Sequence, residues 1–218
     1  MILGKRVALT TVVGFMIVAI VSTWAGGQAA GPADAPRAKS RPSATTSAPA
    51  SQPAGATLDK SIDLWLQGKN AEAVAAFLAI NWKPGQATDK GSLLALKEED
   101  FLKLSHAQQE KEFGQLSELY KPWRELDRHI LGLAKDAFEA KDYATAERYL
   151  LASLDCGRYF MDDSKLCEIT RMVGRAIKGS TLTKMISLYE AIPDQAKLDK
   201  ARKELGDMPT ASQLSAPR

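Results

Sequence analysis

The sequence predicts an all-α domain of about six to eight helices, preceded by an N-terminal membrane segment and a disordered linker. Only two valines, Val74 and Val173, lie between Leu58 and Gly206, whereas the helix formers Ala, Leu, Lys, Glu and Gln are abundant there. Apolar residues recur at steps of three and four, and no long stretch alternates apolar with polar residues. This pattern favours helix hairpins over any sheet.

Residues 1–30 have the form of a signal peptide or an N-terminal transmembrane anchor. Lys5 and Arg6 precede an uncharged stretch of 18 residues, Val7 to Trp24, and small residues follow this stretch from Ala25 onward. A signal peptide needs a shorter apolar core and such a small-residue site, while 18 helical residues extend about 27 Å, nearly the thickness of a bilayer core. Both alternatives stay open.

Both alternatives predict the same orientation of the chain relative to the membrane. The two cations stay on the cytoplasmic side, so we expect a single-pass membrane protein or an exported one with its domain on the extracytoplasmic side. Val7 to Trp24 would contact the membrane if the segment is not cleaved. No cysteine precedes Cys156, which argues against a lipid attached near the N-terminus.

Residues 31–57 are predicted to be a disordered linker. From Gly26 to Thr57 the chain has no large apolar residue, and Ala, Pro, Ser, Thr and Gly dominate. Such a composition buries too little apolar surface to offset its ordering entropy. The last residues, 207–218, are predicted to be a tail of the same kind, which leaves 58–206 as the helical domain.

The first helices of the domain are predicted from two apolar stripes separated by Gly68 and Asn70. The stripes predict a hairpin, and their members are Leu58, Ile62, Trp65 and Leu66, then Ala73, Val74, Phe77 and Ile80. Lys83 to Gln86 has the form of a type II turn, with proline second and glycine third. A short helix is expected within Ser92 to Leu104.

A long helix is predicted to follow, with a capping box of Ser105 and Gln108 at its start. Its apolar residues alternate steps of three and four without a change of phase at Pro122, and they are Leu116, Leu119, Trp123, Leu126, Ile130, Leu133 and Ala137. We expect one helix, kinked at Pro122. The alternative is two helices, with Pro122 as the first residue of the second.

The next stretch contains a set of small, apolar and turn residues at helix-hairpin spacing: Leu133, Ala134, Ala137, Lys141, Asp142, Tyr143, Ala146, Leu150 and Leu154. This set resembles a tetratricopeptide repeat. Lys141 stands where that family's turn has glycine, and the closing proline is absent. The earlier hairpin repeats the pattern 73 residues upstream, rather than at the family's period of 34. The resemblance implies paired, closely packed helices, which generic helix hairpins would share.

Three further helices complete the predicted domain, over Ser164 to Lys178, Thr181 to Ile192 and Asp194 to Leu205. Gly157, Gly179 and Gly206 stand at expected helix ends, where a left-handed residue is needed. A loop is therefore expected from Arg158 to Ser164.

The two cysteines suggest a disulfide between Cys156 and Cys167, placed symmetrically about that loop in a protein predicted to be exported. Closing so short a loop would contribute about 3 kcal/mol. The alternative is two small buried thiols. Tyr159 and Phe160, in the same loop, are expected either to fold back onto the core or to form a small exposed contact for a partner.

The sequence contains few residues or motifs that indicate a reaction or a bound ligand. The net charge is +3, and without Lys5 and Arg6 it is 27 basic against 26 acidic residues, which predicts no nucleic-acid partner. Only His106 and His129 could supply imidazole, and no phosphate loop, zinc motif or serine elbow is present. We predict no catalytic residue, metal or cofactor. Acidic runs such as Glu98 to Asp100 are typical of helix starts.

The function that these patterns favour is an envelope-associated protein-binding or scaffold module, which holds a protein or peptide in a concave surface between helix hairpins. One alternative is a cell-envelope hydrolase that uses a carboxylate site. Another is a structural envelope protein without a dedicated ligand. A deep pocket lined by carboxylates would favour the hydrolase, and a shallow groove lined by Tyr, Trp and Leu would favour the module.

Overall fold

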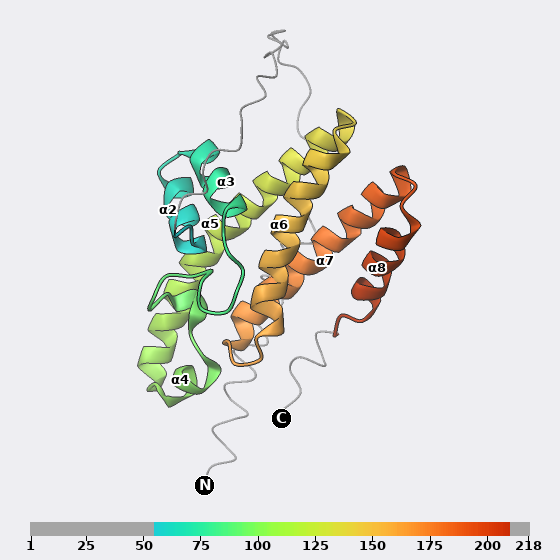
Figure 1. Cartoon of the computed structure of the whole chain (residues 1–218). Coiled ribbons are helices and arrows are strands. Elements are labelled where there is room, and N and C mark those ends of the chain that lie inside the picture. Colours follow the sequence, from blue (N-terminus) through green and yellow to red (C-terminus); the bar gives the residue numbers. More distant parts are fainter. Residues whose placement is uncertain (1–54, 210–218) are drawn as a thin grey trace, which may run out of the picture. The chain divides into compact units, whose positions relative to one another are not determined.

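The computed structural model describes residues 55–209 (Figure 1). The apolar stripes of the sequence lie on seven α-helices, α2 to α8, and one 3-10 helix, η1, connects two of them. Within this range the structure contains no β-strand, only an isolated bridge between Lys97 and Leu166. The all-α prediction and the number of helices are therefore confirmed. The predicted membrane segment, and nearly all of the predicted linker and tail, lie outside the described residues. None of the described helices is both long and apolar enough to span a bilayer.

The first hairpin consists of α2 (Leu58–Leu66) and α3 (Asn70–Leu78). Thr57 caps α2 by accepting a hydrogen bond from the Lys60 amide, and Gly68 makes the turn with a φ of 74°. The type II turn is also present: the Gln86 amide donates to the Lys83 carbonyl at 3.0 Å, and Gly85 has a φ of 74°. Both local predictions are confirmed.

The segment before the long helix is more broken than predicted. It contains η1 (Leu93–Ala95) and α4 (Glu98–Lys103) instead of one short helix. Between them the backbone pairs with the chain that enters α7: the Cys167 amide donates to Leu96 at 2.9 Å, and the Glu98 amide donates to Lys165 at 2.9 Å. This pairing ties two segments that lie far apart in the sequence.

One continuous helix, α5 (His106–Glu139), passes through Pro122, so the two-helix alternative is wrong. Gln108 Oε1 accepts hydrogen bonds from the amide and the hydroxyl of Ser105, as a capping residue at this position does. The buried side of α5 begins at Leu116 and continues to Ala134. Leu133, part of the predicted stripe, is only half-buried.

The hairpin between α5 and α6 (Tyr143–Asp162) closes at the turn where Lys141 replaces the expected glycine. Lys141 has a φ of 61°, and it is the one residue other than glycine with a positive φ among residues 55–209. A side chain in this left-handed region costs about 1 kcal/mol or more, because its Cβ lies too close to the backbone.

Replacing Lys141 with glycine is therefore expected to raise the free energy of unfolding by about 0.5–1 kcal/mol, since glycine adopts this φ without strain but loses more chain entropy. Urea denaturation monitored by circular dichroism would measure the change. Lys135→Gly, within α5, is expected to destabilise by a similar amount and serves as the control. A Lys141→Gly variant that is less stable than the wild type would contradict this explanation of the turn.

The C-terminal half of the domain differs from prediction in its helix ends. α6 continues through Gly157 to Asp162, and α7 (Glu168–Ala191) is one helix where two were predicted. Gly179 lies inside α7, and Gly206 is the last residue of α8 (Gln195–Gly206). Gly157, Gly179 and Gly206 are not among the residues with positive φ, so their predicted role as left-handed helix ends is wrong.

Two glycines instead allow α6 and α7 to approach closely (Figure 1). A Cβ added to Gly157 would lie 2.6 Å from the Lys178 backbone nitrogen, and a Cβ on Gly174 would lie 2.7 Å from the Phe160 Cβ. Both distances are shorter than real Cβ atoms tolerate. The small residues are thus required by helix packing.

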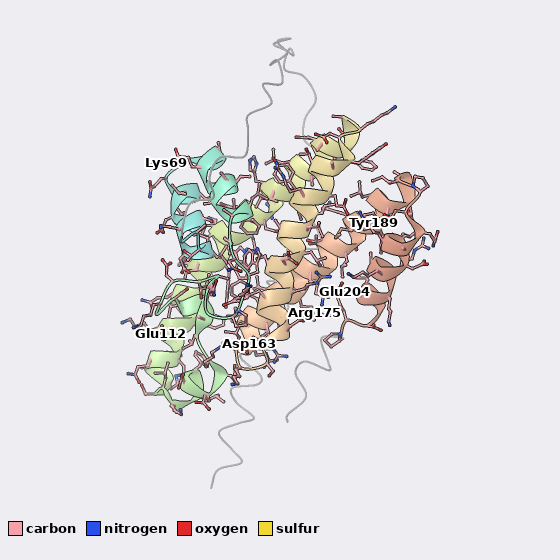
Figure 2. The ribbon with its side chains drawn as sticks, in the orientation of Figure 1. Lys69, Glu112, Asp163, Arg175, Tyr189 and Glu204 are labelled. Carbon is pink, nitrogen blue, oxygen red and sulfur yellow. The ribbon has the colours of Figure 1, made fainter. Side chains whose placement is uncertain are left out.

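The core of the described domain lies between α5, α6, α7 and α8, and an aromatic group joins it to the first hairpin. Trp123 and Phe160 are fully buried, with ring centroids 4.7 Å apart, and Trp82 contacts Phe77 and Phe160. On the other side, Glu204 of α8 (labelled in Figure 2) binds Arg158 of α6 and Lys178 of α7. These ion pairs join α6, α7 and α8, and the buried contact between Trp123 and Phe160 helps to position α5, which carries the candidate site.

Candidate functional site

The predicted contact residues Tyr159 and Phe160 do not form an exposed surface. Both lie in α6 rather than in a loop, Phe160 is fully buried, and Tyr159 is half-buried. The Trp82 ring packs against both of them, with centroids at 5.9 Å from Tyr159 and 6.5 Å from Phe160. Folding back onto the core is the alternative that the structure supports, so the proposed partner contact at Phe160 is wrong.

Cys156 and Cys167 are both free and buried in the structure. The two cysteines do not lie symmetrically about a loop from Arg158 to Ser164, because α6 continues past Cys156 to Asp162. Burial raises the pKa of the Cys156 thiol well above its ordinary value, and it raises the pKa of Cys167 to about 12, with the Glu98 charge adding to the second shift. Neither thiol is poised to act as a nucleophile.

We expect both thiols to react slowly with the thiol reagent DTNB in the native protein at pH 8 and at least about 100-fold faster in guanidinium chloride, because the reactive thiolate is suppressed by burial. Counting reactive groups in denaturant without reductant should give two thiols. A count of zero would show that the cysteines are bridged, and rapid labelling of the native protein would contradict their burial.

A shallow groove lies between α2 and α5, the first helices of the two hairpins. Trp65, in the last turn of α2, contacts His129 of α5, with ring centroids 5.2 Å apart. The groove encloses about 420 Å³, and the side of α5 that lines it carries Glu125, Arg128, His129, Gly132, Leu133 and Asp136. Trp65, His129 and Leu133 are all half-buried. Leu66, next to Trp65, is 66% exposed.

The floor of the groove is open at Gly132. A Cβ built there would meet no heavy atom within 4 Å, so a side chain at this position would project into free space. The apolar surface at the centre of the groove is flanked by charged residues of both signs. None of Glu125, Arg128 and Asp136 forms an ion pair with another described residue.

The carboxylates of the groove are not arranged for glycoside hydrolysis. Glu125 and Asp136 are 11 residues apart on one helix, which separates their backbones by about 16 Å. Glycosidases hold their two carboxyl groups roughly 5–10 Å apart. Within residues 55–209, no three His, Cys, Asp or Glu side chains gather in a way that could hold a metal ion. The groove offers an apolar and aromatic contact surface.

A buried polar cluster lies behind the groove, where α5, α6 and α7 meet. The Ser153 hydroxyl of α6 donates to Asp127 Oδ1 of α5 at 2.6 Å, and Ser153 Oγ lies 2.8 Å from Thr181 Oγ1 of α7. Because Ser153 donates to Asp127, it accepts from Thr181. Asp127 is 2% exposed, and Ser153 and Thr181 are fully buried.

Asp127 has no ion-pair partner among the described residues. Burial raises the pKa of Asp127 to about 7, against the Ser153 hydrogen bond and the charges of Lys184 and Arg128, which lower it. A raised carboxyl pKa can mark a catalytic acid, but Asp127 does not line the groove. Its effect is on stability.

Sequence reasoning missed the residues that form the groove, and it missed the buried carboxyl. Trp65 and His129 are 64 residues apart, and Trp65 fits an apolar stripe, so nothing in the sequence alone marks it as half-exposed. The burial of Asp127 could have been predicted, because it lies between Trp123 and Ile130 on the buried side of the helix pattern. An acidic residue in a stripe of that kind indicates a buried polar contact.

Comparisons with known proteins do not add to this description. No family model matches the chain, and no curated protein or solved structure matches it significantly.

Proposed function

We propose that the domain is a protein-binding module whose groove between α2 and α5 takes a segment of another protein. The observation that carries the proposal is the half-exposed Trp65, packed against His129 in an open groove beside the exposed Leu66. Tryptophan is the residue type most enriched among those that dominate binding energy at protein interfaces. An open, amphipathic groove of this kind suits an extended or helical segment.

The architecture supports the same function. The groove joins two helix hairpins, α2–α3 and α5–α6, and the turn of the second has the left-handed residue that the tetratricopeptide-like pattern requires. We further propose that the domain works on the extracytoplasmic side of a membrane, which rests on the charged and then apolar N-terminus alone. N-terminal sequencing of the mature protein would distinguish a released domain, starting near Gly26 or Ala30, from an anchored one.

The groove can be tested without knowing the partner. Affinity capture with the tagged full chain from detergent-solubilised native membranes should yield a discrete partner, and Trp65→Ala should reduce its recovery at least about tenfold, as loss of an interface tryptophan does. Circular dichroism should show that the variant is folded. Equal recovery with the wild type and with Trp65→Ala would rule out the groove as the binding site.

A second variant blocks the groove without removing anything. Gly132→Leu should fill the open floor and abolish capture, while the free energy of unfolding rises by about 0.5–1 kcal/mol because leucine replaces glycine inside a helix. Gly114→Leu is the matched control, since Gly114 lies on the same helix, also faces open space and is outside the groove. Capture that survives Gly132→Leu would contradict the proposal.

A further inference from the structure

Three basic residues follow one side of α5 next to the groove. Lys121, Arg124 and Arg128 are spaced i, i+3 and i+7, which places them on a common face of the helix. Lys121 and Arg128 are exposed, and Arg124 is half-buried. None of the three forms an ion pair with another described residue.

Lys184 of α7 adds a fourth cation near Arg128. The hydrogen-bond chain from Asp127 through Ser153 to Thr181 holds these parts of α5 and α7 close together. Lys184 is exposed one turn beyond Thr181, and both Lys184 and Arg128 act electrostatically on Asp127. We call the set Lys121, Arg124, Arg128 and Lys184 the basic strip.

No cation of the basic strip forms an ion pair with a surface carboxylate among the described residues. The carboxylate that Arg128 and Lys184 act on, Asp127, is buried and 2% exposed. The exposed Glu118 and Glu125 of the same helix form no ion pair with any of the four cations. Unpaired cations at this density attract an anionic group.

We propose that the partner segment that enters the groove continues across α5 onto the basic strip and carries acidic residues beside its apolar anchor. This inference rests on the proposed function of the groove. Arg128 belongs to both surfaces, since it lines the groove and is part of the strip. From Arg128 to Lys121 the helix extends about 10 Å, which three residues of extended chain cover. Continuity with the groove favours an acidic polypeptide over a membrane surface.

The experiment uses a random 12-residue peptide library displayed on phage, selected against the detergent-solubilised full chain. The selected peptides should contain an aromatic or large apolar residue next to a run enriched in Asp and Glu relative to the unselected library. With the best of these peptides, Lys121→Gln combined with Lys184→Gln should weaken binding about fivefold or more at 50 mM salt, and the difference should shrink near 0.5 M salt because the charges are screened.

The control keeps the change in net charge and moves it away from the strip. Lys83→Gln combined with Lys90→Gln neutralises two exposed lysines of the loop after α3 that form no ion pair with a described residue, and it should leave peptide binding unchanged. Both variants leave the groove residues intact.

The outcomes separate the two proposals. Selected peptides that need Trp65 but show no acidic enrichment, or that bind the Lys121/Lys184 variant as well as the control, would overturn the inference and leave the groove standing. Acidic peptides that need the basic strip but bind Trp65→Ala unchanged would overturn the proposed function of the groove. Strip-dependent binding to vesicles of phosphatidylglycerol and phosphatidylcholine, without peptide selection, would assign the strip to a membrane and overturn the inference.

Discussion

Gly174→Ala is expected to destabilise the domain by about 3 kcal/mol, and Gly174→Val by more, because α6 has no room for a side chain there. The added Cβ would lie 2.7 Å from the Phe160 Cβ, 2.8 Å from the Met161 amide nitrogen and 3.0 Å from the Gly157 carbonyl oxygen. Two of these are backbone atoms, so relief requires α6 and α7 to separate and their core contacts to loosen. Chemical denaturation would measure the loss.

Two further variants test whether the loss of stability arises from the close packing of α6 against α7. Gly114→Ala should stabilise the domain by about 0.5–1 kcal/mol, because it makes the same chemical change within a helix but meets no neighbouring atom. Gly157→Ala combined with Gly174→Ala should cost less than the two single changes added together, since one separation of the helices relieves both clashes. Gly174→Ala with wild-type stability would show that α6 and α7 are not packed as closely as described.

The stability of the wild-type domain is expected to fall as the pH rises from about 4 to 7, because Asp127 binds a proton in the folded state that it loses on unfolding. Burial raises the pKa of Asp127 to about 7, above its ordinary value of 3.8. Between these two values the folded chain holds more protons than the unfolded chain, so the contribution is present below pH 4 and is lost as the pH passes through 7. The slope is at most about 1.4 kcal/mol per pH unit.

Asp127→Asn isolates this contribution. The amide oxygen can still accept the Ser153 hydrogen bond but does not titrate, so the variant should lose this part of the pH dependence and be more stable than the wild type at pH 8. Urea denaturation of both proteins at intervals from pH 4 to pH 8 gives the comparison. Equal pH profiles would show that Asp127 is not a buried carboxyl with a raised pKa.

The helices were predictable because their signals are local. The stripes around Ile62, Phe77 and Ile130 each identify a buried side, and the capping residue Gln108 and the Pro84–Gly85 turn need only their immediate neighbours. Pro122 was correctly placed within a helix because the apolar phase does not change there. The continuous helix α5 follows from that phase.

The end of α6 and the continuity of α7 through Gly179 were not predicted, because a glycine can either end a helix or allow two helices to approach, and the sequence alone does not distinguish these roles. Gly157 and Gly174 are small so that helices can touch, a requirement set by residues 13 to 21 positions away. Interpreting Gly157 as a helix end produced the false loop from Arg158 to Ser164. That error also placed Tyr159 and Phe160 in a loop, where an exposed contact was one of two alternatives.

The residues of the groove could not be predicted from local sequence patterns, for a related reason. Leu133 follows the predicted apolar stripe of α5, yet α2 ends at Leu66 and leaves that part of α5 only half covered. Which members of a stripe stay exposed depends on how far the neighbouring helix extends. The sequence predicted a binding module with a groove between hairpins, whereas the residues that form it, Trp65 and His129, became apparent from their contact.

Site-specific photo-crosslinking in the native cells tests the central claim most directly. A benzoylphenylalanine at position 136, which lines the groove, is compared with one at position 111, which is exposed on the same helix and lies outside both the groove and the basic strip. We expect a discrete crosslinked protein from position 136 that is absent from position 111 and disappears when Gly132→Leu is added. The same adducts from both positions, or none from position 136, would contradict the proposed groove.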